Sequence, residues 1–141
     1  MKIKTPGRIC LFGEHQDYLG LPVIAMAISK FSSLSGVARN DAKVVIRKPD
    51  INNIEEFSLN DIKYDSKQDI FKSGFNICKR FGFKFSRGFD VTVKSDIPIK
   101  AGTSSSSSLL VSWIHFLTRN ADNAKNISCL LYTSPSPRDN R

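Results

Sequence analysis

The stretch FDVTVKSDIPIKAGTSSSSSLLVSWIHFL, residues 89–117, combines a strand, a serine-rich loop and a helix. Phe89, Val91 and Val93 alternate with polar residues, which predicts a strand with one buried face. A turn is expected over residues 95–102, and from about Ser104 the apolar residues follow a helical period. The buried face of this helix is expected to consist of Leu110, Trp113, Ile114 and Leu117.

The serine-rich loop lies where a helix N-terminus offers unpaired backbone N–H groups and a partial positive charge, which together attract anions. Gly102 leaves room for a phosphate close to the backbone, and hydroxyl groups in the first turn can cap the helix, bind phosphate or ligate Mg²⁺. A low-complexity linker is the alternative for such a tract. We favour a phosphate-binding loop because a strand precedes the tract and an amphipathic helix follows it. The pattern GxxxxGK[ST] of classical P-loop proteins is absent.

The chain before this stretch contains several apolar segments. Pro6-Gly7 interrupts the first one, and a helix over residues 69–81 should end at Gly82. Strands are expected over residues 9–12 (buried), 22–28, 31–38, 43–47 and 54–59. This order predicts an α+β fold in which helices pack on one face of a mixed sheet.

A polar loop, GEHQDYLG over residues 13–20, follows the first strand. Glu14, His15 and Asp17 provide hydrogen-bond donors and acceptors, as a pocket for a polyol requires. Arg8 can face the same cleft and stabilise the oxygens of a transferred phosphoryl group. A solvated loop is one alternative, and a metal site is another, although this group has no second cluster of ligands elsewhere in the chain.

Together the two loops resemble the first and second motifs of the GHMP kinases, the family of galacto-, homoserine, mevalonate and phosphomevalonate kinases. TPGRICLFGEHQDYLGLPVIAMAI, residues 5–28, resembles the galactokinase signature PGRxNLIGEHxDYxGxxVLPxAI. DIPIKAGTSSSSS, residues 96–108, resembles the phosphate loop PxGAGLSSSAA. The resemblance implies a fold like ribosomal protein S5 domain 2, and ATP-dependent phosphorylation of a sugar hydroxyl.

Carried over to this sequence, the resemblance implies that Glu14, His15 and Asp17 bind the sugar, and that Arg8 is the catalytic residue beside the transferred phosphoryl group. It implies that Ser106 also ligates Mg²⁺. The residues implied to bind the nucleotide phosphates are Lys100, Ala101, Gly102, Thr103, Ser104, Ser105 and Ser106.

Several positions depart from the family pattern. Lys100 replaces the usual Gly, Thr103 the usual Leu and Cys10 the usual Asn, and Gln16 and residues 19–22 also differ. These departures leave fucose, arabinose, glucuronate and heptose open as substrates besides galactose. A GHMP kinase for a non-sugar alcohol such as mevalonate and a sugar-sensing regulator also remain alternatives.

The last thirteen residues, 129–141, contain two Ser-Pro pairs and do not continue the pattern before them. Residues 129–139 resemble a translated sequencing adapter, although a genuine Pro/Ser-rich tail is the alternative. We therefore expect an incomplete GHMP kinase N-terminal domain over residues 1–128 and a non-native tail beyond it. The family's catalytic Asp and its third motif would then lie outside the chain, and the fragment is expected to be inactive alone.

The 141 residues carry a formal charge of +8, but their basic residues are scattered, which favours no nucleic-acid partner. A basic RNA-binding module of S5-like fold is the weaker alternative. The sequence contains no apolar run of about 20 residues that could span a membrane. The three cysteines have no metal-ligand spacing, and together with the lack of a signal peptide they predict a cytoplasmic protein with free thiols.

Overall fold

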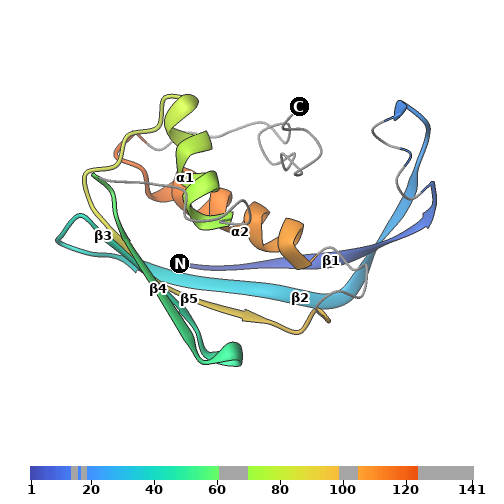
Figure 1. Ribbon diagram of the computed structural model, residues 1–141, viewed down its shortest axis with the longest axis horizontal. Coiled ribbons are helices and arrows are strands. Elements are labelled where there is room, and N and C mark those ends of the chain that lie inside the picture. The colour runs from blue at the N-terminus through green and yellow to red at the C-terminus, as the bar shows by residue number, and fades with distance from the viewer. Residues whose placement is uncertain (14–15, 17–18, 61–69, 99–104, 124–141) are drawn as a thin grey trace.

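The computed structural model describes residues 1–13, 16, 19–60, 70–98 and 105–123 (Figure 1). The strands are β1 (Lys2–Phe12), β2 (Ile24–Ala38), β3 (Lys43–Lys48), β4 (Asn53–Ser58) and β5 (Phe89–Ser95). The helices are the 3-10 helix η2 (Pro49–Ile51) and the α-helices α1 (Ile70–Arg80) and α2 (Ser105–Asn120). None of the described helices is long and apolar enough to cross a membrane.

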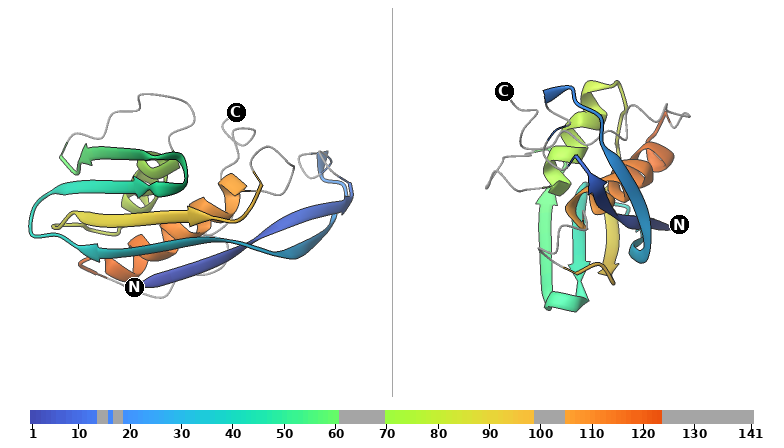
Figure 2. Two further views of the ribbon diagram at one scale, coloured as in Figure 1. Left: turned by 90° about the horizontal axis from the view of Figure 1, so that it is seen from below. Right: turned by 90° about the vertical axis from the view of Figure 1, so that its right-hand side faces the viewer.

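The five strands form one mixed sheet in the order β1-β2-β5-β3-β4. Neighbouring strands are antiparallel except β3 and β5, which run parallel with Val44 opposite Phe89. Figure 2 shows β5 in the middle of the sheet, between the two hairpins β1–β2 and β3–β4. Since β3 and β5 run parallel, their C-terminal ends lie at the same end of the sheet.

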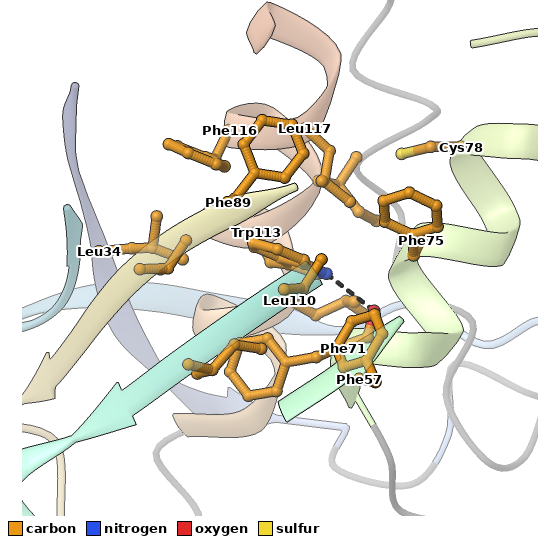
Figure 3. Close-up of a cluster of buried hydrophobic side chains, with 14 of the residues drawn as sticks. Leu34, Phe57, Phe71, Phe75, Cys78, Phe89, Leu110, Trp113, Phe116 and Leu117 are labelled. Atoms are coloured by element: carbon orange, nitrogen blue, oxygen red, sulfur yellow. Dashed lines mark hydrogen bonds between the residues drawn. The ribbon is translucent and has the colours of Figure 1, made fainter. Parts of the chain in front are cut away.

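Both α-helices lie on one face of the sheet, as the sequence predicted (Figures 1 and 2). The core between the two layers is centred on Trp113, whose ring is fully buried (Figure 3). Its indole Nε1 donates a hydrogen bond of 2.8 Å to the carbonyl of Phe71 in α1, so the two helices are joined by packing and by a polar contact. The four α2 residues expected to be buried, Leu110, Trp113, Ile114 and Leu117, all lie in this core.

The hairpin β1–β2 extends beyond the rest of the sheet as an arm (Figure 1). Residues 32–35 of β2 pair with both β1 and β5, whereas residues 24–27 and 31 pair with β1 alone. Two strands were expected over residues 22–28 and 31–38, but β2 is a single strand from Ile24 to Ala38.

Residues 9–12 belong to a strand as expected, but the expectation that this strand is buried was wrong. Leu11 is 48% exposed and Phe12 is 71% exposed, because they lie in the arm, where none of the other described strands pairs with the hairpin. Ile24 and Met26 of the opposing strand are also exposed. The apolar run was correctly assigned to a strand, but an apolar run alone does not fix what covers it.

The helix expected over residues 69–81 is α1, and it ends as predicted. Gly82 follows it with a φ of 89°, the left-handed conformation that glycine favours after a helix. Its amide N–H donates to the carbonyl of Lys79, and the N–H of Phe83 donates to that of Cys78. Asp69, expected near the start of α1, lies outside the described residues.

Candidate nucleotide-binding cleft at the start of helix α2

Hydrogen-bonding hydroxyl groups hold the N-terminal half of α2 against β1 and β2. The Ser108 Oγ lies 2.9 Å from the Ser32 Oγ in a buried contact, and the Ser112 Oγ lies 2.5 Å from the Thr5 Oγ1. Ser32 also contacts the Ser95 Oγ at 3.3 Å, at the end of β5. Small hydroxyl side chains let the helix lie close to the strands while each of these hydroxyl groups keeps a partner. The position of the first turn of α2 is therefore set by specific contacts.

Helix α2 runs antiparallel to β1. Asn120, the last residue of α2, donates a hydrogen bond to the Met1 sulfur, whereas Ser112 contacts Thr5 further along the strand. From that contact, Ser106 is roughly 9 Å further toward the start of α2 and Arg8 is roughly 10 Å further along β1. The start of α2, with Ser106, and the outer part of β1, with Arg8, therefore lie toward the same end of the molecule, and Figure 1 shows the two elements running side by side.

A cleft of about 310 Å³ opens beside the first turn of α2. Its apolar wall comes from strands and helices on several sides, namely Ile51, Ile70, Val93, Ile97 and Leu109. Its polar lining consists of Ser32, Lys48, Asp50, Ser95 and Ser106. This volume is at the lower end of the range for small-molecule sites, and the mixed lining suits a flat apolar group with a polar end.

The polar residues at the far wall of the cleft are held by their neighbours. The Asp50 Oδ2 accepts a hydrogen bond of 2.9 Å from the backbone N–H of Ser95. The Lys48 ammonium lies 2.8 Å from the Glu55 Oε1 and 5.1 Å from the centre of the Phe71 ring. The Ser95 Oγ in turn accepts the N–H of Ile97 at 3.2 Å. These contacts fix the C-terminal ends of β3 and β5 around the cleft.

A separate group of ion pairs lies at the other end of β5. Asp90 pairs with Arg47, and the Asp41 carboxylate accepts two hydrogen bonds from Arg39. The hydrogen bond from Arg39 lowers the pKa of Asp41 to about 2, and that from Arg47 lowers the pKa of Asp90. None of these four charged residues lines the cleft.

Of the predicted site residues, Arg8 and Ser106 lie in the described part of the chain, and both are exposed. Ser106 lines the cleft. Ser105 is the first residue of α2, and its side chain is outside the description. The remaining predicted residues all lie outside the described ranges, namely Glu14, His15, Asp17, Lys100, Ala101, Gly102, Thr103 and Ser104. Their roles stay predictions.

In the described part of the chain, no group of three or more His, Cys, Asp or Glu side chains is placed to hold a metal ion. Ser106 lies in the first turn of α2 and lines the cleft. Its hydroxyl is a hard oxygen donor and is therefore a suitable ligand for one coordination position of Mg²⁺. Nucleotide phosphates commonly supply further oxygen ligands to this ion.

Sequence reasoning missed the far wall of the cleft. Lys48, Asp50 and Ser95 are not among the residues that the sequence predicted for the site. A polar residue directly after a strand was the available signal, because ligands often bind at the C-terminal ends of parallel strands. That signal required knowing that β3 runs parallel to β5, which residue periodicity does not reveal.

Two family models match the chain, in the order that the motifs predicted. The galactokinase galactose-binding signature matches residues 3–32, and the GHMP kinases N terminal domain matches residues 69–129. The two matched ranges contain every residue predicted for the site. The departures at Cys10, Lys100 and Thr103 therefore do not prevent either match.

Galactokinase from Bacillus subtilis is 35% identical over 110 residues, which cover 74% of this chain but 28% of that protein. Lactococcus lactis galactokinase, solved with galactose, superposes with a TM-score of 0.80 at 28% identity, over 93% of this chain and 34% of that one. Methanococcus jannaschii mevalonate kinase superposes with a TM-score of 0.76 at 26% identity, over 93% of this chain and 43% of that one. The chain thus spans less than half the length of these relatives.

The fold and both family models place the chain in the GHMP kinase superfamily, of which it contains the N-terminal domain fold. Within that superfamily the chain is galactokinase-like, since its N-terminal residues match the galactokinase signature and its relatives at about 35% identity are galactokinases. The expectation of an α+β fold with a mixed sheet and helices is confirmed.

Proposed function

We propose that this chain provides the nucleotide-binding cleft and the sugar-binding loop of a kinase that transfers phosphate from ATP to a sugar hydroxyl. Galactose is the first candidate substrate, because residues 3–32 match a galactose-binding signature. The single observation that carries the proposal is the position of Ser106. It lies in the first turn of a 16-residue helix and also lines a cleft with an apolar wall.

The cleft offers what a nucleoside triphosphate requires. The start of α2 presents unpaired backbone N–H groups and the positive end of a helix dipole, which favour the triphosphate. Ile51, Ile70 and Leu109 provide apolar contacts for a flat base. In this proposal Lys100, Ala101, Gly102, Thr103, Ser104, Ser105 and Ser106 contact the phosphates, and Ser106 ligates Mg²⁺. The ion would neutralise charge on the phosphate oxygens during transfer.

The sugar is assigned to the N-terminal loop. Glu14, His15 and Asp17 orient the acceptor hydroxyl, and Arg8 stabilises the oxygens of the transferred phosphoryl group. Support comes from the position of Arg8 toward the same end of the molecule as Ser106. The match covers only 28% of the Bacillus subtilis galactokinase. We therefore assign the group that accepts the proton of the sugar hydroxyl to residues outside this chain.

We assign this protein to the cytoplasm, with no nucleic acid or membrane as partner. Among the described cysteines, Cys10 and Cys78 are free thiols, which suits a reducing compartment. A mevalonate-type alcohol is the second candidate substrate, because the Methanocaldococcus jannaschii mevalonate kinase is 28% identical over 81% of this chain.

The experiment has two parts. In the 141-residue chain, titration with MgATP should give saturable binding that Ser106→Ala weakens. In a galactokinase-length polypeptide that carries this chain as its N-terminal part, ADP release should depend on galactose. Asp17→Ala should abolish this release while MgATP binding survives. Release driven by mevalonate and not by galactose would transfer the assignment to the second candidate.

A further inference from the structure

We propose that Asp50 is a specificity-determining residue that selects nucleotides by accepting a hydrogen bond from the nucleoside. This inference rests on the proposed function, because it assumes that the cleft beside α2 binds ATP. It goes further by naming the residue that recognises the nucleoside and the type of group, a hydrogen-bond donor, that this residue recognises.

The Asp50 carboxylate is held in place through only one of its oxygens. Oδ2 accepts the N–H of Ser95 at 2.9 Å, which fixes the carboxylate at the wall of the cleft. Within the described part of the chain, the other oxygen, Oδ1, accepts no hydrogen bond. An ionised carboxylate can only accept hydrogen bonds, so a ligand that reaches Oδ1 must present an N–H or O–H group.

The nearby Lys48 does not form an ion pair with Asp50 among the described contacts. The Lys48 ammonium is held by the Glu55 carboxylate at 2.8 Å and lies over the Phe71 ring, and its side chain is 20% exposed. These two partners belong to β4 and α1, so the positive charge is directed to groups other than Asp50. The carboxylate therefore remains an acceptor for the ligand.

The charges of the cleft also orient the ligand. The triphosphate is attracted by the start of α2, where Ser106 lies, and is repelled by the Asp50 carboxylate on the η2 side. The nucleoside end of the molecule is consequently directed to Asp50. Two groups of ATP can donate there, the 6-amino group of adenine and the ribose hydroxyls. Hypoxanthine carries an acceptor oxygen in place of that amino group.

Asp50→Asn tests this assignment in the 141-residue chain. The amide oxygen can still accept the Ser95 N–H, and the amide nitrogen then presents a donor to the cleft in place of an acceptor. Dissociation constants are measured by calorimetry for the Mg²⁺ complexes of ATP, ITP, 2′-deoxy-ATP and 3′-deoxy-ATP. The ratios between nucleotides are compared, because removing one negative charge strengthens the binding of every polyanion.

The wild-type chain should bind ATP roughly tenfold more tightly than the analogue that lacks the donor read by Asp50. In Asp50→Asn that ratio should fall to about one. If the variant no longer distinguishes ATP from ITP, the contact is assigned to the base. If it no longer distinguishes ATP from one of the deoxy nucleotides, the contact is assigned to the ribose. Asp50→Glu, which keeps an acceptor, should retain the direction of the preference, and it also serves if the Asn variant does not fold.

Asp122→Asn is the matched control, since this exposed carboxylate lies beyond the C-terminal end of α2 and accepts a hydrogen bond from Ser86. It should leave every ratio unchanged. If Asp50→Asn also leaves every ratio unchanged while ATP still binds, the role of Asp50 is overturned and the nucleotide cleft stands. If the wild-type chain binds none of the four nucleotides, both the cleft assignment and the role of Asp50 are overturned.

Discussion

The hydroxyl oxygens of Ser32 and Ser108 lie 2.9 Å apart in a buried contact between β2 and α2. The match to the galactokinase signature ends at Ser32 in β2, and Ser108 is the fourth residue of α2, the helix whose start is proposed to bind the phosphates. Since Ser32 also contacts Ser95 at the end of β5, one hydroxyl connects three elements around the cleft. The position of the helix N-terminus therefore depends on buried polar contacts as well as on apolar packing.

Ser108→Ala should lower the free energy of unfolding by about 1–2 kcal/mol, because it leaves the buried Ser32 hydroxyl with a poorer set of partners. Urea unfolding followed by the fluorescence of Trp113 measures the change. Ser107→Ala is the matched control, because Ser107 is the preceding, half-buried residue of the same helix. It should change stability by no more than about 0.5 kcal/mol. Equal losses in the two variants would contradict the importance of the Ser32 contact.

Gly74→Ala should destabilise the chain although alanine favours helix over glycine by about 1 kcal/mol. A Cβ at Gly74 would lie 2.7 Å from the Trp113 Cδ1 and 3.2 Å from the Leu110 Cδ1, so the two helices must move apart. We expect a net loss of about 1–3 kcal/mol in thermal or urea unfolding. A stabilised variant would mean that α1 and α2 do not pack as closely as described.

His115 should make the chain less stable as the pH falls. Partial burial, and secondarily the charge of Arg119, lower its pKa in the folded protein below the usual value of 6.5. Protonation therefore favours the unfolded chain, so the full contribution is present above about pH 6.5 and is lost as the pH falls below it. His115→Gln should reduce the difference in unfolding free energy between pH 8 and pH 5.5. An unchanged difference would assign the pH dependence to other groups.

The arm formed by the outer parts of β1 and β2 should be the least protected part of the sheet. Residues 24–27 and 31 of β2 pair with β1 only, whereas residues 32–35 pair on both sides. A two-stranded ribbon is marginally stable, and local opening governs amide exchange. We expect amides of residues 24–27 to exchange at least roughly tenfold faster than those of residues 32–35. Equal protection in hydrogen-exchange mass spectrometry would contradict this difference.

Local patterns in the sequence predicted most of the fold. The alternation of Phe89, Val91 and Val93 and the helical period from Leu110 to Leu117 reflect burial on one face, and the structure buries those residues. The exposure of Leu11 and Phe12 could not be predicted this way, because it depends on how far β5 extends alongside β2. Strand length and pairing are properties of the whole sheet.

The sequence predicted the side of the cleft at the start of α2, but not the opposite side, which contains Asp50 and Ser95. The start of α2 follows from a strand–loop–helix pattern, so Ser106 could be proposed as a ligand-contacting residue from sequence alone. Asp50 and Ser95 are separated by 45 residues and meet because β3 and β5 run parallel. Such a contact leaves no local signature in the chain.

The central claim, that the start of α2 binds the phosphates of ATP, is tested most directly by NMR titration of the ¹⁵N-labelled 141-residue chain with MgATP. The backbone amide signals of Ser106 and Ser107, and those of Asp50 and Ile51 across the cleft, should shift together with one dissociation constant. Those of Arg119 and Asn120 at the far end of the helix should not. Shifts confined to the face of the sheet opposite α1 and α2, or no shifts at millimolar MgATP, would contradict the claim.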